Sequence, residues 1–168
     1  LSKFKDHADE LVGVDLEDPQ VDSFVNYIQS DISNIDIEDL SIDIVISRAV
    51  LEHVEHPQEV FNEVSRILKN DGHFLMLVPN LYDYASLISL VIPNRYHKYI
   101  VSKTEGRASE DTFPAFYKCN SKNSINRLAA NSSFQIEEFL YLGQYPSYLM
   151  FNRVFFALGI LYEKTVSK

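Results

Sequence analysis

The sequence predicts an α/β fold, because short apolar runs alternate with amphipathic helix in its first half. Four runs rich in Val, Ile and Leu have the length and composition of strands buried on both faces of a parallel sheet. They are residues 10–15, 24–31, 42–47 and 73–78. A helical pattern fills the interval between the third and fourth runs. Strand, helix and strand in this order form a βαβ unit with a right-handed crossover.

The helix expected in that interval has a defined start and end. Pro57 suits a first turn, where its missing N–H would have no partner anyway. An apolar stripe follows at spacings of three and four residues, formed by Val60, Phe61, Val64, Ile67 and Leu68. Gly72 follows Asn70 and Asp71, and we expect it to end the helix in the left-handed conformation.

Composition excludes several classes of protein. The 168 residues carry 15 Lys+Arg and 24 Asp+Glu, a formal net charge of −9, and 46% are hydrophobic, which excludes wholesale disorder. The acidic balance argues against a nucleic-acid surface, because phosphate binding needs clustered Lys and Arg. No apolar run approaches the roughly 20 residues that span a bilayer. A lone cysteine, Cys119, excludes an internal disulfide and a Cys-rich metal site. We expect a cytoplasmic protein.

A single domain over residues 1–168 is expected, in three parts. After the strand-rich part, residues 1–80, the rhythm breaks at an aromatic-rich insertion, residues 81–118. The last part, residues 119–168, is expected to form a helix, a strand and an apolar helix, over Ser121–Ser132, Phe134–Leu142 and Tyr148–Val166. Ser121 is the expected N-cap of the first of these helices.

Polar residues at the ends of the predicted strands are the candidates for ligand binding. In open α/β sheets, ligands bind at the carboxyl ends of the strands. A carboxylate there, such as Asp15, can accept two hydrogen bonds from a ribose diol. Asp31 could accept from an adenine amino group, with Ile32 against the ring face. Acids also end strands as solvated caps, but two at successive strand ends favour a nucleoside pocket.

The order of motifs resembles a class I S-adenosylmethionine-dependent methyltransferase. The resemblance covers residues 8–80 well and 112–142 more loosely. Its most specific part is the Leu51-Glu52-His53 turn followed by Pro57, an amphipathic helix, Asp71-Gly72 and a strand. The other matching segments are Val12–Asp15, Gln29–Asp31, Asp43–Val54 and Val78–Asn80.

This resemblance implies a doubly wound, Rossmann-like sheet, with residues 1–80 as the cofactor-binding half and S-adenosylmethionine as cofactor. Asp15 would hold the cofactor ribose, and Leu16 would border the adenine. Asp31 and Ile32 would bind the edge and face of that ring. Ser47 and Arg48 would pass close to the methionine part, largely through their backbone.

One departure concerns the glycine-rich turn that the family carries upstream of the Asp15 strand. Glycine lets backbone approach the cofactor closely there, but Gly13 lies inside a predicted strand and the sequence holds no such turn. Since the chain also begins with Leu1 in place of Met, we expect a fragment whose sheet is incomplete at the N-terminus.

His53 is the candidate general base, since it follows the end of the third strand and His suits proton transfer near neutral pH. The competing interpretation is that His53 only caps or packs the start of the helix. His53 and His56 are three residues apart, whereas the zinc-protease pair is four apart. We therefore expect solvated side chains and no metal.

The methyl acceptor is expected to be a small molecule, with a hydroxyl of a sugar or lipid-linked glycan favoured by the aromatic insertion. Those aromatic residues could equally form a small core of their own. The apolar segment 148–162 offers a peripheral membrane contact, although packing against the sheet suits its few charges better.

Three other functional classes stay open. The chain could be a non-catalytic partner subunit or an inactive fragment. A nicotinamide-dependent oxidoreductase would also place Asp15 on a ribose. Ser86, Tyr99 and Lys103 resemble the active site of short-chain dehydrogenases, but too few strands separate them from Asp15, and chance explains the match better.

Overall fold

The computed structural model describes residues 4–17, 24–83, 114–142, 146, 149–150 and 152–166. The chain forms two compact units. The first comprises residues 1–47, 56–76 and 128–134, and the second comprises residues 48–55, 77–127 and 135–168.

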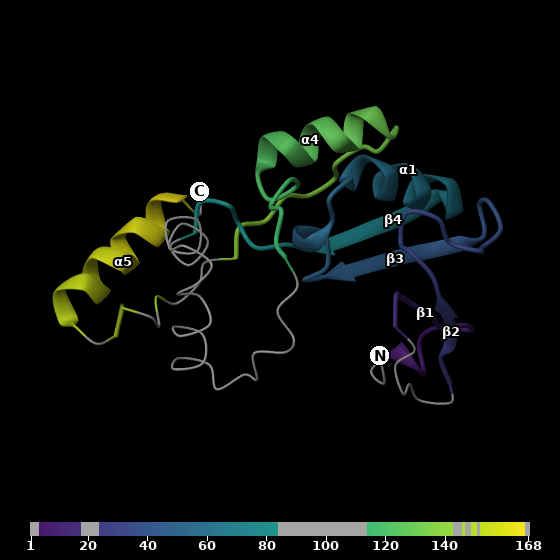
Figure 1. The fold of residues 1–168 in the computed structure, drawn as a ribbon, viewed down its shortest axis with the longest axis horizontal. Coiled ribbons are helices and arrows are strands. Elements are labelled where there is room, and N and C mark those ends of the chain that lie inside the picture. The colour runs from purple at the N-terminus through teal and green to yellow at the C-terminus, as the bar shows by residue number, and fades with distance from the viewer. Residues whose placement is uncertain are drawn as a thin grey trace. The chain divides into compact units, whose positions relative to one another are not determined.

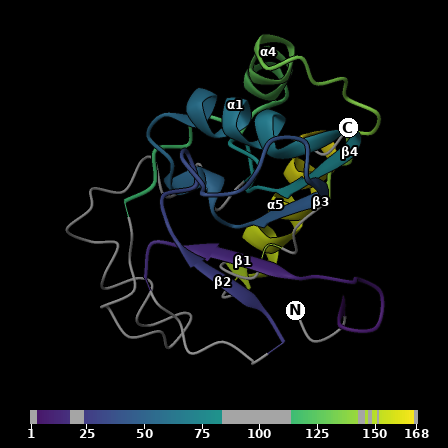
Figure 2. The same cartoon turned by 90° about the vertical axis from the view of Figure 1, so that its right-hand side faces the viewer.

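In the first unit, β1 (Val12–Asp15) and β2 (Asn26–Gln29) form a parallel pair. The register sets Val12 opposite Asn26 and Asp15 opposite Gln29, so both strands end at the same edge (Figure 2). The strands predicted over residues 10–15 and 24–31 are thus present, though each is shorter than the apolar run around it.

A second pair joins β3 (Ile42–Arg48) to β4 (Leu68–Leu77). Backbone hydrogen bonds run from Ser41 N to Ile67 O over 2.9 Å at one end and from Ala49 N to Leu77 O over 3.0 Å at the other. Partner numbers increase together along both strands, which means that they are parallel. The βαβ unit predicted from the sequence is therefore present.

Helix α1 (Pro57–Ile67) makes the crossover between these strands and lies over them (Figure 1). Pro57 occupies its first turn, as predicted. The predicted stripe is buried, and Phe61 packs edge-on against Phe74 of β4 and Phe134, with ring centroids 5.5 and 6.1 Å apart. Each such buried side chain contributes about 1.5–3 kcal/mol, so this aromatic cluster holds helix, strand and residue 134 together.

The predicted end of this helix was wrong. Helix α1 ends at Ile67, and Leu68 is the first residue of β4 rather than the last residue of the stripe. Gly72 lies within β4 and does not cap a helix. A Cβ there would approach the Leu68 side chain to 2.9 Å and the Lys69 carbonyl to 3.0 Å, so close packing, not a left-handed turn, requires glycine.

The expectation that this sheet is buried on both faces also needs correction. Side chains alternate between the two faces of a strand, and α1 covers one face of the β3–β4 pair. On the other face Ile44, Ile46 and Leu75 are 56%, 56% and 50% exposed. Within the described residues of this unit, only one face is therefore covered.

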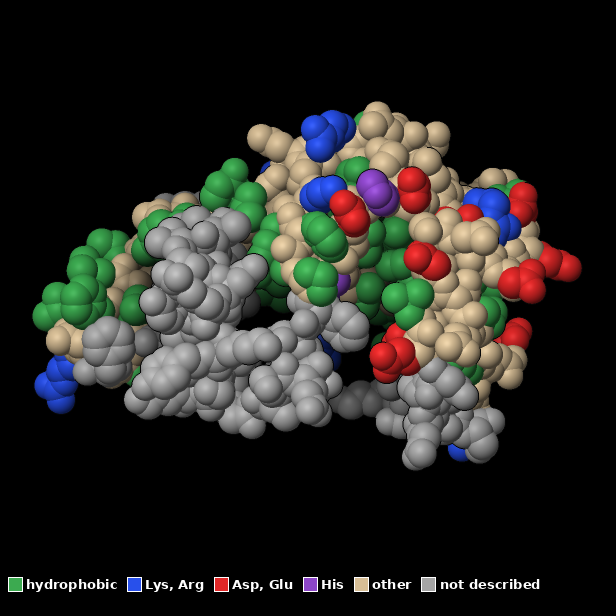
Figure 3. All heavy atoms as spheres, in the orientation of Figure 1, with side chains coloured by type: hydrophobic (Ala, Val, Ile, Leu, Met, Phe, Trp, Pro, Cys, Tyr) green, Lys and Arg blue, Asp and Glu red, His purple; other side chains and the backbone are tan. Residues whose placement is uncertain are grey.

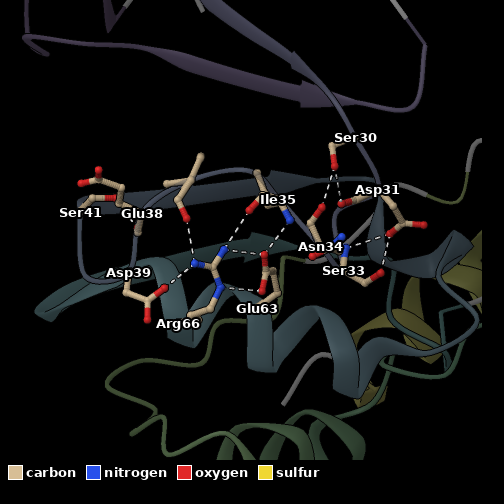
Figure 4. Close-up of polar contacts among 11 residues, drawn as sticks. Ser30, Asp31, Ser33, Asn34, Ile35, Glu38, Asp39, Ser41, Glu63 and Arg66 are labelled. Atoms are coloured by element: carbon tan, nitrogen blue, oxygen red, sulfur yellow. Dashed lines mark hydrogen bonds and ion pairs between the residues drawn. The ribbon is translucent and has the colours of Figure 1, made fainter.

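A polar cluster fastens the segment between β2 and β3 to α1 (Figure 4). The guanidinium of Arg66 donates to Ile35 O at 2.9 Å, Ile37 O at 2.8 Å and Asp39 Oδ1 at 2.5 Å. It also donates to both oxygens of Glu63, at 2.7 and 2.9 Å. Glu63 in turn accepts from Ile35 N at 2.6 Å. The bonds from Arg66 lower the pKa of Glu63, and the same contacts raise the pKa of Arg66.

Helix α4 (Lys122–Asn131) begins in the second unit, and its last residues belong to the first. It closely matches the helix predicted over Ser121–Ser132. Ser121 caps it as expected, since Ser124 N donates to Ser121 Oγ over 3.3 Å. Residues 134–142 do not form the predicted strand. The segment alternates apolar and polar residues, but among the described residues no neighbouring strand pairs with it.

The last helix, α5 (Arg153–Val166), begins later than predicted. Asn152 lies before the helix rather than inside it, and its Oδ1 accepts from Val154 N at 2.9 Å. Gly159 packs tightly on the preceding segment, because a Cβ there would lie 2.9 Å from Pro146. None of the helices described in this structure has the length and apolar composition needed to cross a bilayer.

Most of the aromatic insertion, residues 84–113, lies outside the described residues, as do Ser86, Tyr99 and Lys103. The structure therefore leaves the expectations for that segment as predictions.

We predict that Glu63→Gln destabilises the protein by about 1–2 kcal/mol at pH 7, because the charge-assisted bonds to Arg66 are lost. The folded pKa of Glu63 is lowered from its usual 4.5. The contribution of Glu63 to the free energy of unfolding is thus complete above pH 4.5 and is lost as the pH falls through the lower pKa of the folded state. The free energies of unfolding of wild type and Glu63→Gln should therefore converge as the pH falls. Urea unfolding of the two proteins from pH 7 to pH 3 measures this.

Asp43→Asn is the matched control. Asp43 pairs with Lys69 at 2.8 Å, but the two side chains are 77% and 47% exposed, so its loss costs less than about 1 kcal/mol. Equal losses from the two variants would contradict a special role for the Glu63–Arg66 pair.

Candidate functional site

The first part of the candidate site is the edge where β1 and β2 end. Ser30 N donates to Asp15 O at 2.9 Å, and Gln29 Nε2 donates to Leu16 O at 3.0 Å. Asp15 Oδ1 accepts from Glu17 N at 3.3 Å. These bonds fix the backbone around Asp15 while its carboxylate stays exposed.

The second carboxylate, Asp31, is held in a tight local turn. Its Oδ1 accepts from Ser33 N at 2.8 Å and from Ser33 Oγ at 2.7 Å, as Figure 4 shows. These two bonds lower the pKa of Asp31. Ser30 Oγ donates to Asn34 O at 2.6 Å and closes the same turn. The lowered pKa keeps Asp31 ionised, and the turn fixes its position.

The structure thus brings the Asp15-Leu16 and Asp31-Ile32 pairs to neighbouring strand ends. Leu16 is 64% exposed and Ile32 is half-buried, so an apolar side chain accompanies each acid. Ionised carboxylates accept hydrogen bonds only. This edge can therefore bind a ligand that carries hydroxyl or amino donors around an apolar ring.

Two residues of this edge were missed by sequence reasoning. Gln29 holds Leu16, and Ser33 holds Asp31. The spacing Asp31-Ile32-Ser33 is typical of a turn in which an Asp side chain accepts from the backbone two residues on, so the role of Ser33 was detectable. The Gln29 contact depends on the pairing of β1 with β2 and has no local signal.

Ser47, the next predicted residue, lies half-buried near the end of β3. Among the described residues, no hydrogen bond joins Ser47 to Asp15 or Asp31.

Arg48 and His53 belong to the second unit. Arg48 is exposed, and Ala49 after it has a φ of 55°. A side-chain-bearing residue in this left-handed region costs about 1–2 kcal/mol. Such strained backbone is found preferentially at functional sites, here directly after a strand end.

His53 lies in a single 3₁₀ turn, Leu51–His53. Its Nδ1 is 3.0 Å from Pro114 O, and a carbonyl can only accept, so Nδ1 carries the proton. Nε2 is then the ring nitrogen that carries the lone pair. This contact is compatible with a general base, because it fixes the tautomer and the ring.

Backbone bonds tie the 3₁₀ turn to the segment before α4. Phe116 N and Tyr117 N donate to Glu52 O at 2.8 and 3.2 Å, and Cys119 Sγ lies 3.3 Å from Leu51 O. Burial, with the negative charge of Glu52, raises the pKa of Cys119 to about 11, which makes the thiol unreactive near neutral pH. Among the described residues, no group of three His, Cys, Asp or Glu side chains could hold a metal ion.

Comparison with known proteins concerns mainly the first part of the chain. Residues 1–76, less than half of the 168 residues, match the family model described as a methyltransferase domain. This part of the chain is therefore similar to a methyltransferase domain, and the likeness implies S-adenosylmethionine as cofactor. No curated protein matches the sequence.

Solved structures confirm the methyltransferase fold. A candidate methyltransferase from Bacillus halodurans C-125 has a TM-score of 0.56 at 15% identity, over 98% of this chain and 69% of that chain. An S-adenosylmethionine-dependent methyltransferase from Mesorhizobium loti has a TM-score of 0.54 at 16% identity, over 88% and 74%. The YcgJ protein of Bacillus subtilis has a TM-score of 0.54 at 17% identity, over 97% and 68%. At these identities the likeness concerns the fold, and it bears out the predicted Rossmann-like class.

The residues at the edge of β1 and β2 fit the adenosine part of this methyltransferase cofactor. The exposed carboxylate of Asp15 uses only Oδ1 among the described residues, for the bond from Glu17 N. Its Oδ2 is thus available to a ribose hydroxyl. The fixed, ionised Asp31 suits an amino group, with Ile32 beside it. The sequence holds no glycine-rich turn for the methionine part.

Proposed function

We propose that this methyltransferase chain transfers a methyl group from S-adenosylmethionine to a small molecule. The observation that carries the proposal is the pair of acids, Asp15 and Asp31, at adjacent ends of parallel strands. In the proposal Asp15 accepts from the ribose hydroxyls and Leu16 borders the adenine. Asp31 accepts from the adenine amino group, with Ile32 on the ring face. Ser47 and Arg48 lie along the methionine part through their backbone.

We infer that the acceptor is a hydroxyl group, as on a sugar or a lipid-linked glycan, and that His53 is its general base. When bound, the cofactor would supply a methyl group on a positively charged sulfur, and the electron pair of the broken sulfur–carbon bond would stay on that sulfur. His53 Nε2 would take the hydroxyl proton as the acceptor oxygen attacks this methyl group. The Nδ1 contact with Pro114 O supports this role because it orients the ring.

We predict that Asp15→Ala weakens binding of S-adenosylmethionine and of its demethylated product about 10-fold to 100-fold, because the ribose loses a charge-assisted partner. Isothermal titration of both compounds into the 168-residue chain measures this. Asp36→Ala is the control, since Asp36 is an exposed acid in the segment between β2 and β3, which also carries Asp31. If the folded wild-type chain binds neither compound, the chain is a non-catalytic relative of the enzymes.

We predict that His53→Gln lowers kcat for methyl transfer by about 100-fold, which is the usual contribution of a general base. Gln can still donate to Pro114 O, so cofactor affinity stays unchanged. His56→Gln, three residues away and exposed, is the control. Turnover is measured as release of the demethylated cofactor. A kcat that survives His53→Gln would assign His53 to packing alone.

We also propose that α5 contacts a membrane surface that presents the acceptor. Hydrophobic side chains gather on this helix in Figure 3. Val154, Leu158 and Leu161 are 67%, 55% and 61% exposed and form one stripe. Arg153 and Lys164 lie near its two ends. An exposed apolar stripe of this kind suits shallow insertion at a lipid interface.

We predict that the Val154→Ser/Leu158→Ser double variant reduces the vesicle-bound fraction about tenfold, because two apolar side chains no longer enter the lipid. Sedimentation with phosphatidylcholine vesicles, which suit a chain of net charge −9, measures the bound fraction. Leu140→Ser/Leu142→Ser is matched in chemistry and exposure, at 67% and 69%, but lies outside α5. An equal fall in the vesicle-bound fraction for the two double variants would refute a specific role for α5.

A further inference from the structure

Glu52 carries a buried carboxylate oxygen that has no hydrogen-bond partner among the residues that the structure describes. The residue is only 6% exposed, and its Oε2 makes no hydrogen bond in the described part of the chain. Burying an unsatisfied polar group costs about 1–3 kcal/mol, and more where the group is charged. Native proteins leave few such groups, so an orphaned acceptor of this kind points to a donor that arrives from outside the chain.

Hydrogen bonds to the backbone fix the turn that carries Glu52. Its own carbonyl accepts from Phe116 N and Tyr117 N, and the neighbouring carbonyl of Leu51 faces Cys119 Sγ. The thiol of Cys119 lies close enough for the charge of Glu52 to raise its pKa. The turn that carries Glu52 is thus fixed by backbone bonds, and these leave Oε2 without a partner among the described residues.

Glu52 is also the immediate neighbour of His53, the proposed general base. Consecutive Cα atoms are about 3.8 Å apart, so a molecule the size of a sugar ring is large enough to reach both side chains. The segment opposite the turn, residues 114–118, is mostly exposed, and Tyr117 within it has a φ of 51°. For a ligand donor to reach the buried Oε2, this segment would have to shift and open its two bonds to Glu52 O.

We propose that Glu52 is a positioning residue for the methyl acceptor, whose second hydroxyl group donates a hydrogen bond to Oε2. This rests on the proposed function, and it narrows the acceptor to a molecule with neighbouring hydroxyl groups, such as a sugar ring. His53 contacts the hydroxyl that is methylated, and Glu52 contacts the adjacent one. A carboxylate accepts from hydroxyl groups without changing its charge.

The test compares Glu52→Gln with wild type on two matched probes, methyl glucoside and cyclohexanol, at saturating S-adenosylmethionine. The probes share a six-membered ring, but only the first has neighbouring hydroxyl groups. We expect a KM at least 10-fold higher for methyl glucoside in Glu52→Gln, little change in kcat, and no change for cyclohexanol. Glu55→Gln, an exposed acid three residues away, is the control. Titration with the demethylated cofactor checks separately that the cofactor site is intact.

Thermal unfolding of the free protein gives a second readout that needs no turnover. Removing the orphaned charge in Glu52→Gln raises the melting temperature by about 2–4 °C, whereas Glu55→Gln leaves it unchanged. A lower melting temperature for Glu52→Gln overturns the proposal, because it shows that the carboxylate is satisfied inside the fold. Two further results also overturn it: an unchanged KM for methyl glucoside in Glu52→Gln, or a wild-type chain that binds cofactor and methylates cyclohexanol but not methyl glucoside. Loss of cofactor binding in wild type is instead the failure of the proposed function.

Discussion

The guanidinium of Arg66 is the contact on which the first unit depends. It joins helix α1 to the segment between β2 and β3 through two carbonyls and two carboxylates, those of Glu63 and Asp39. A segment without regular structure has many polar backbone groups to satisfy. Arg66 satisfies several at once with a rigid fork of donors. The position of Asp31 follows, because its turn lies at the start of the same segment.

The chemistry of the candidate site follows from the parallel pairing of β1 and β2. Parallel strands that start together also end together, so an acid after each strand end lies at one edge of the sheet. Asp15 stays exposed there, whereas Asp31 is fixed by Ser33 and has a lowered pKa. The carboxylate of Asp15 can therefore adjust to a ligand, whereas the carboxylate of Asp31 is already ionised and held in place. Such fixed, charged acceptors reduce the ordering that binding has to impose.

Predictions from local sequence patterns were wrong where the same pattern fits two different secondary structures. Leu68 continues the apolar spacing of α1, but its backbone is extended, with φ −70° and ψ 138°, and it starts β4. Periodicity cannot separate the last residue of a helix stripe from the first buried residue of a strand. The segment 134–142 alternates like a strand, yet a strand exists only when a neighbour supplies hydrogen bonds. In both cases the outcome depends on pairing with residues far away in the sequence.

The sequence by itself determined the α/β class, the βαβ unit, the proline-started helix and the acids at two strand ends. These features rest on local spacing and on the order of motifs, which a single chain displays directly. Only the tertiary structure decided how Gln29 holds Leu16 and how Arg66 gathers its partners. It also showed that Oε2 of Glu52 has no partner in the described residues. Hydrogen bonds between distant residues, and the absence of one at a buried atom, arise from packing and leave no local signal.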